Sequence, residues 1–199
     1  MGFLDTLLGR SKPVRPDLDR LFALPAAAVT LQAAEGYVPT GAGSVCFASV
    51  EGGAFARLQK EVRELLDADA GSDAPVEFSQ DGYGYTWLLA RQPDGGLSAL
   101  VNDLHAVNTL LQDAGFGPQL LCSLVGFRPE EDDGTGKQPP LALVYLYKRG
   151  TFYPFAPVPG ASEQRDNARE LRVRGLLSDD LRVEEDLSRW FPVWGAPGL

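Results

Sequence analysis

Apolar residues recur every three or four positions in two parts of the chain, which is the period of one face of an α-helix. The first part predicts a helix over about 54–67, with its apolar stripe at Phe55, Leu58, Val62 and Leu65. The second predicts a helix over about 97–112, ended by Gly115, with its stripe at Leu97, Leu100, Val101, Leu104, Val107 and Leu111. Upstream, Asp17 is placed to cap a short helix that Pro25 ends.

Other segments have the pattern of β-strands. We predict two strands within 26–50, joined by a connection rich in Gly and Pro. A hairpin follows, because Asp81-Gly82 suits a type I′ turn and the aromatic and apolar residues after it alternate at Tyr83, Tyr85, Trp87 and Leu89. Two further apolar strands, 118–127 and 140–150, are expected at the centre of the sheet.

The order of these elements is β-β-α-β-β-α-β-β. Strands that arrive in adjacent pairs favour antiparallel hairpins, and two helices with apolar stripes require a common core. The sequence therefore predicts an α+β fold in which an antiparallel sheet is built from β-β-α units, with the helices packed on one face.

Both ends of the chain differ from this central part. Residues 1–16 form an amphipathic segment and a linker, with apolar positions at Phe3, Leu4, Leu7 and Leu8 and prolines at 13 and 16. We expect 17–199 to be a single domain. Its last part, 151–199, is a C-terminal extension rich in aromatics and proline. TFYPFAPVPG is expected to be an extended crossing, 163–177 a helix, and Trp190, Phe191 and Trp194 to dock on the domain.

Charge and cysteine content narrow the classes of partner and the cellular location that we expect. The net charge is −9, with 27 acidic and 18 basic residues among 199. Nucleic-acid binding needs clustered Lys and Arg, so nucleic acid is a poor candidate partner. Cys46 and Cys122, the two cysteines, lie in apolar runs and are expected to be buried and reduced, because free cysteine is among the most buried residue types. A disulfide would require them to face each other on paired strands. We expect a cytoplasmic location.

The candidate chemistry is sparse. His105 is the one histidine, and we expect a solvated helix face there, beside Ser98, Asn102 and Thr109. The alternative is that this polar stripe is a hydrogen-bonding contact surface. A metal site combines several ligands and a nucleophile needs a nearby base, so we predict no catalytic residue, no metal and no cofactor. The acidic run 130–133 lacks the ligand spacing of a calcium loop.

One combination of residues favours binding. Basic groups beside aromatics occur at interface hot spots, and they come together here in Arg128, Lys148, Arg149, Phe152, Tyr153 and Phe155. These six residues are a candidate partner-binding edge. The alternative is that the aromatics close the core.

The N-terminal segment is a second candidate contact. Phe3, Leu4, Leu7 and Leu8 form an apolar face flanked by basic residues, as in helices that bind peripherally to a membrane surface. Docking of residues 1–10 on the domain itself or on a partner remains an alternative.

Several strings resemble the actinobacterial PspA-associated protein family PspAB. The most distinctive are LYKRGTFYPFAP and RWFPVWGAPGL, and MGFLDTLLGR, GSVCFASVEGGAF and GFGPQLLCSLVGF add to the likeness. The resemblance implies a part in a phage-shock-like envelope stress response. It also implies association with PspA, a coiled-coil protein at the inner face of the membrane, and with an HtpX-type membrane protease.

The resemblance supplies no catalytic residues. We therefore expect a non-enzymatic adaptor or regulator that binds a protein partner, cytoplasmic or peripheral at the inner face of the membrane. Two alternatives remain: a small enzyme with a site near His105 and the Lys148/Arg149 edge, or a chaperone-like domain that shields an apolar segment of a partner.

Overall fold

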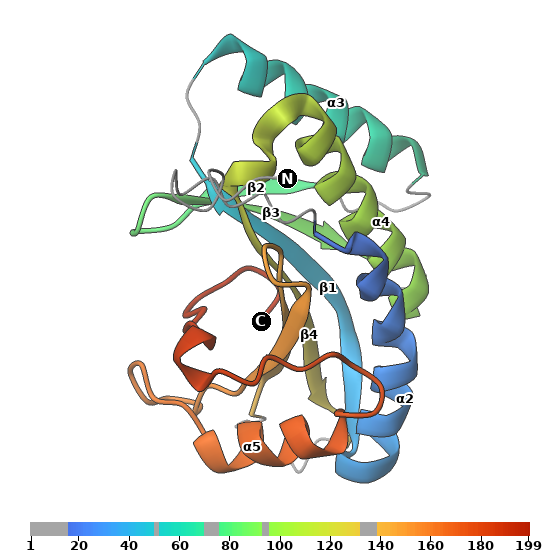
Figure 1. Ribbon diagram of the computed structural model, residues 1–199, viewed down its shortest axis with the longest axis vertical. Helices are drawn as coiled ribbons and strands as arrows, with labels where there is room; N and C mark the ends of the chain where they lie inside the picture. Colours follow the sequence, from blue (N-terminus) through green and yellow to red (C-terminus); the bar gives the residue numbers. More distant parts are fainter. Residues whose placement is uncertain (1–15, 50–51, 70–75, 93–95, 132–138) are drawn as a thin grey trace, which may run out of the picture.

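The computed structural model describes residues 16–49, 52–69, 76–92, 96–131 and 139–199. Its centre is a six-stranded, fully antiparallel sheet in the order β2-β3-β1-β4-β5-β6 (Figure 1). The strands are β1 (Tyr37–Ala48), β2 (Glu77–Gln80), β3 (Tyr85–Arg91), β4 (Leu120–Pro129), β5 (Leu141–Leu146) and β6 (Thr151–Phe155). This architecture confirms the predicted α+β class.

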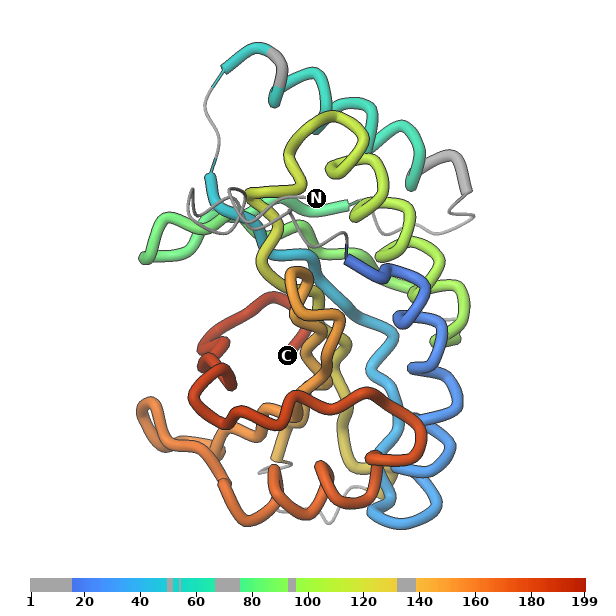
Figure 2. Tube along the Cα trace, viewed as in Figure 1, coloured from blue at the N-terminus to red at the C-terminus, as the bar shows by residue number. Residues whose placement is uncertain are grey.

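Helices cover one face of the sheet. They are η1 (Leu18–Ala23), α2 (Leu24–Glu35), α3 (Gly53–Asp69) and α4 (Gly96–Leu111), and the short turns η2 (Gln112–Phe116) and η3 (Gly117–Gln119) follow α4. The chain trace shows α2 and α4 along one side of the sheet, with α5 (Asn167–Leu176) below, beside β6 (Figure 2). The predicted helices at 54–67 and 97–112 are thus confirmed. The helix predicted at 163–177 is confirmed from Asn167 to Leu176, whereas 163–166 precede it.

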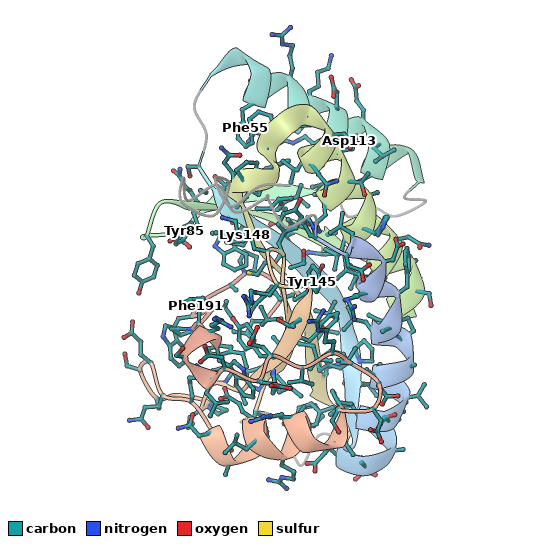
Figure 3. All side chains as sticks on the ribbon, viewed as in Figure 1. Phe55, Tyr85, Asp113, Tyr145, Lys148 and Phe191 are labelled. Atoms are coloured by element: carbon teal, nitrogen blue, oxygen red, sulfur yellow. The ribbon has the colours of Figure 1, made fainter. Side chains whose placement is uncertain are left out.

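Two apolar layers lie on opposite faces of the sheet because side chains alternate along each strand. Val45 and Phe47 of β1 face the helices, whereas Cys46 between them faces the other way. The layer on the face opposite the helices, which contains Cys46, is the second layer. The C-terminal segment completes it with Trp190, Val193 and Ala196. Figure 3 shows side chains on both sides of the sheet.

The region before β1 differs from the prediction. Residues 24–35 form helix α2, and one long strand, β1, takes the place of the two predicted strands. Pro25 begins this helix instead of ending one, because proline is tolerated in the first turn, where its missing N–H would have no partner. The helix ends at Gly36, whose φ of 66° is the left-handed conformation that glycine adopts readily.

The hairpin is confirmed, but its turn is not type I′. The turn spans Asp81–Gly84, Gly84 N donates to Asp81 O, and the positive φ belongs to Gly84, not to Gly82. The Asp81 carboxylate accepts hydrogen bonds from the Tyr83 and Tyr85 amides. These contacts stabilise a longer turn than Asp-Gly alone would form.

The segment 151–155 is a regular strand and not an extended crossing. It pairs with β5 as the edge strand β6, a position that accommodates Pro154 because the missing N–H of proline breaks no pairing beyond the edge. The chain near Val183 then covers this edge, where Phe152 N donates to Arg182 O and Glu184 N to Phe152 O.

The remaining C-terminal residues pass through η4 (Leu187–Arg189) and lie on the second face of the sheet. The predicted domain boundary at residue 16 stays a prediction. The predicted contacts of Phe3, Leu4, Leu7 and Leu8 lie outside the described residues.

Candidate functional site: an aromatic pocket under the C-terminal segment

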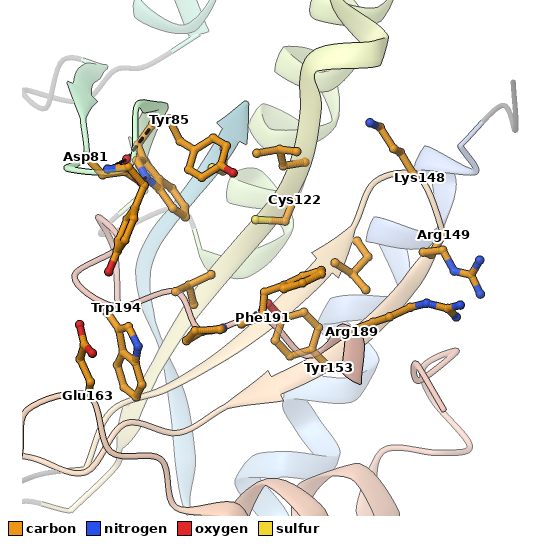
Figure 4. A pocket seen from close by; sticks show the side chains of 17 residues that line it. Asp81, Tyr85, Cys122, Lys148, Arg149, Tyr153, Glu163, Arg189, Phe191 and Trp194 are labelled. Atoms are coloured by element: carbon orange, nitrogen blue, oxygen red, sulfur yellow. Dashed lines mark hydrogen bonds between the residues drawn. The ribbon is translucent and has the colours of Figure 1, made fainter. Parts of the chain in front are cut away.

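A half-open pocket of about 710 Å³ lies on the second face of the sheet (Figure 4). Its volume is in the range of small-molecule and peptide side-chain sites, roughly 300–1,000 Å³. The lining comes from the sheet, from the β2–β3 hairpin and from the C-terminal segment, and comprises Cys46, Asp81, Tyr83, Tyr85, Trp87, Leu121, Cys122, Leu146, Lys148, Arg149, Tyr153, Glu163, Arg189, Phe191, Pro192, Val193 and Trp194. We refer to it as the aromatic pocket.

The floor of the aromatic pocket is formed by β-strands. Cys46, Trp87 and Cys122 lie on neighbouring strands and face the same side, opposite to the helices. Tyr153 of β6 lies in the same layer and is almost fully buried. Burial raises the pKa of the Tyr153 hydroxyl well above its ordinary value, so this group is a neutral hydrogen-bond donor.

The hairpin wall is fixed by Asp81. Its carboxylate accepts from Trp87 Nε1 at 2.9 Å and from the Tyr83 and Tyr85 amides at 2.9 Å each. Burial acts to raise the pKa of Asp81, but these hydrogen bonds outweigh it and hold the pKa below its usual value. As an anion, Asp81 therefore holds the Trp87 ring and the backbone of the turn that carries Tyr83 and Tyr85.

Hydrogen bonds hold the C-terminal wall against the sheet. Tyr153 Oη donates to Phe191 O at 2.7 Å, and the Tyr153 and Trp190 rings stack with centroids 5.9 Å apart. Arg165 Nη1 donates to Trp190 O at 2.6 Å, while Arg165 Nε pairs with the buried Glu170 carboxylate at 2.9 Å. The C-terminal wall is thus held by Tyr153, which belongs to β6, and by Arg165, which is itself paired with Glu170 of α5.

One end of the pocket is cationic. Lys148, Arg149 and Arg189, which we call the cationic rim, lie on one side in Figure 4, and Asp81 and Glu163 lie on the other. The buried Glu184 carboxylate lies 3.5 Å from Arg149 Nε and 3.4 Å from Arg189 Nη1. Lys148 is exposed and makes no ion pair with the residues that the structure describes.

The predicted binding edge is brought together only in part. Lys148, Arg149 and Tyr153 line the aromatic pocket. Phe152 and Phe155 are fully buried, one on each face of the sheet, so they close the core, as the alternative interpretation expects. Arg128 is exposed near the end of β4, away from the pocket.

His105 does not line the pocket either. It projects from α4 on the helical side, where its Nε2 lies 3.2 Å from Asp19 Oδ1 and its ring packs on Phe22 with centroids 4.8 Å apart. Among the described residues, no three His, Cys, Asp or Glu side chains gather in a way that would hold a metal ion.

Sequence reasoning misses most of the pocket. The alternation through Tyr83, Tyr85 and Trp87 is a usable signal for the hairpin wall, and the aromatics after Arg189 are a signal for the C-terminal wall. Nothing in the local sequence indicates that these two segments, far apart along the chain, face each other across the sheet.

The fold and the pocket define an α+β domain that carries an aromatic, cation-rimmed cavity under its C-terminal segment. The family model for PspA associated protein B (PspAB) matches residues 1–198, and the chain belongs to that family, as its sequence resemblance predicts. No curated protein and no solved structure matches the chain. None of the helices in the described part of the chain is long and apolar enough to cross a membrane.

Proposed function

We propose that this protein is a non-enzymatic adaptor in a PspA-linked envelope stress response, and that the aromatic pocket receives an apolar side chain of a protein partner. The observation that carries the proposal is the pocket itself: an open cavity with tyrosine, tryptophan and phenylalanine in its walls and cations at one end. Interface hot spots are enriched in tyrosine, tryptophan and arginine. The family's association with PspA supports a protein partner.

The charge of the rim restricts the partner segment. Because Lys148, Arg149 and Arg189 lie at one end, a segment with an acidic residue next to its apolar anchor would complement the pocket. Phe191 and Tyr83 are 59% and 72% exposed, so both present apolar area that a partner would cover. PspA is the first partner to test, and an HtpX-type membrane protease is the second.

A non-enzymatic role agrees with the chemistry of the lining. In the described lining, the thiols of Cys46 and Cys122 have no histidine beside them to act as a base, and the Asp81 carboxylate already accepts hydrogen bonds from Trp87 and two backbone amides. A general base needs a free lone pair within reach of its substrate. Asp81 is therefore better suited to positioning the wall than to proton transfer.

The test is a binding titration of the full chain with purified PspA from the same host. Phe191→Ala removes an exposed ring from the pocket wall and should weaken binding at least about tenfold, as for a hot-spot aromatic. Phe22→Ala removes a comparably exposed ring on the helical side and is the matched control, with binding expected to be unchanged.

A charge variant makes the test independent of the aromatic wall. Lys148→Glu should weaken binding and reduce its dependence on salt, whereas Lys60→Glu on the exposed side of α3 should not. If the HtpX-type protease binds instead of PspA, and the variants weaken that binding in the same pattern, the proposed site stands and the partner is the protease. Equal binding by Phe191→Ala and Phe22→Ala, or no binding to either protein, would overturn the proposal.

A further inference from the structure

The two cysteines of the chain meet at the floor of the aromatic pocket. Cys46 of β1 and Cys122 of β4 are direct partners in the antiparallel register, and both thiols are free. Both belong to the same buried layer and both line the pocket. Together they form a cross-strand dithiol that is reached from the pocket side.

The backbone spacing suits a bond between them. Directly opposed residues on antiparallel strands have Cα atoms about 4.5–5.5 Å apart, inside the roughly 4.4–6.8 Å range that disulfides span. The β1–β4 register also shifts immediately after this pair, from Cys46↔Cys122 to Phe47↔Leu120. A bulge at this point leaves the strand free to bend locally as the sulfur atoms approach.

We propose that Cys46 and Cys122 are an oxidisable dithiol that closes to a disulfide by exchange with a low-molecular-weight disulfide admitted through the aromatic pocket. This inference rests on the strand register and the cavity, and it does not depend on the proposed partner. Because the cavity of about 710 Å³ borders the thiols, a small mixed disulfide has room to form before the second thiol reacts.

The exchange proceeds in two balanced steps. The Cys122 thiolate, on the more exposed residue of the pair, attacks one sulfur of the oxidant RSSR and releases RS⁻, which takes up a proton. The Cys46 thiol then loses its proton, attacks the Cys122 sulfur of the mixed disulfide and releases the second RS⁻, which is protonated in turn. The protein loses two hydrogens and two electrons, and RSSR is reduced to two RSH.

The environment of Cys46 sets the order and the pH dependence. The neighbouring Cys122 thiol raises the pKa of Cys46 well above its ordinary value, and burial adds to this effect. Cys46 is also the less exposed residue of the pair, at 3% against 7% for Cys122, and acts as the resolving thiol. Since thiolates are the attacking species, the reaction should accelerate as the pH rises from about 7 to 9.

The experiment incubates the full chain in glutathione buffers of graded oxidised-to-reduced ratio, quenches with acid, alkylates free thiols and measures intact mass. We expect one monomeric oxidised species, two hydrogens lighter, without glutathione and without label, that dithiothreitol restores. We expect Cys46→Ser and Cys122→Ser instead to accumulate a single stable glutathione adduct. The oxidised wild type should also unfold several degrees higher, because the bond closes a long loop.

Three results would overturn the inference. One is wild-type protein that retains glutathione at equilibrium, and another is a disulfide-linked dimer. The third is native protein whose thiols stay unoxidised at every ratio, while circular dichroism shows that the wild type and both serine variants are folded. Each would mean that the two thiols do not pair within one chain through the pocket.

Discussion

Glu184 connects the cationic rim to the C-terminal wall, and replacing it by glutamine tests whether that connection stabilises the fold. The side chain is 4% exposed. One carboxylate oxygen accepts from Thr151 Oγ1 at 2.8 Å and the other from Asp186 N at 3.2 Å. Glu184 O also accepts from Trp190 Nε1 at 3.0 Å.

The magnitude follows from these contacts. Hydrogen bonds to a charged group contribute about 1.5–3 kcal/mol. The ion pairs with Arg149 and Arg189 add little, about 0–1 kcal/mol, because these arginine side chains are 50% and 39% exposed. Glutamine keeps the shape and some of the hydrogen bonds but loses the charge. We expect Glu184→Gln to lower stability by about 2 kcal/mol and Tm by about 4–8 °C at pH 7.

The pKa of Glu184 determines how the stability loss in Glu184→Gln changes with pH. Burial acts to raise the pKa of Glu184, but the Thr151 hydroxyl, the Asp186 amide and the two arginines hold it below the ordinary value of 4.5. A carboxyl whose pKa is lowered by folding stabilises the protein fully above its unfolded pKa and loses that contribution as the pH falls through the folded value. The Tm difference between wild type and variant should therefore shrink below about pH 4.5.

The assay is thermal unfolding followed by circular dichroism between about pH 3 and pH 7, the range that brackets this titration. The exposed neighbour Glu185 supplies the control, and Glu185→Gln should leave Tm within about 1 °C of wild type because surface changes usually matter little. A Glu184→Gln deficit equal to that of the control, or constant down to the lowest pH, would show that the buried carboxylate does not stabilise the fold through its charge.

Two further substitutions test how the C-terminal segment is held. Tyr153→Phe removes the donor to Phe191 O and should cost about 1 kcal/mol, measured by urea unfolding, with no comparable loss in Tyr83→Phe on the exposed turn. In Gly126→Ala, the added Cβ would overlap the Gly198 carbonyl oxygen, so the last residues must move. We expect a cost of about 1–3 kcal/mol and faster carboxypeptidase digestion. Gly175→Ala, where the added carbon meets nothing, should be neutral or slightly stabilising. Unchanged unfolding of both test variants, together with unchanged digestion of Gly126→Ala, would show that these contacts do not hold the segment.

Local patterns in the sequence predict much of the fold. The helical stripes of α3 and α4 and the alternation through β3 are properties of single segments. The structure confirms them except at Leu65, which is 40% exposed while its neighbour Leu66 is buried in its place. The same signal exists for α2, since its buried residues Leu24, Ala27, Ala28 and Leu31 have helical spacing. The prediction is wrong there because proline suits both the end of a helix and its first turn, and Pro25 occupies the first turn.

The candidate site is less predictable because it depends on contacts between distant segments. Cys46 and Cys122 meet only through the β1–β4 register, and Phe191 reaches Tyr153 only after the chain has passed the edge of the sheet. An apolar run predicts a strand but not its partner or its register. The pocket therefore emerges from the tertiary arrangement, although each of its walls has a recognisable sequence.

Amide hydrogen exchange of the full chain, alone and with purified PspA, tests the adaptor proposal most directly. Partner binding in the aromatic pocket predicts slower exchange in the turn 81–86 and in 189–194, with no change in α2. The pocket and α2 lie on opposite faces of the sheet, so the result locates the interface. Protection confined to α2 and α4, with 81–86 and 189–194 unaffected, would contradict the adaptor proposal.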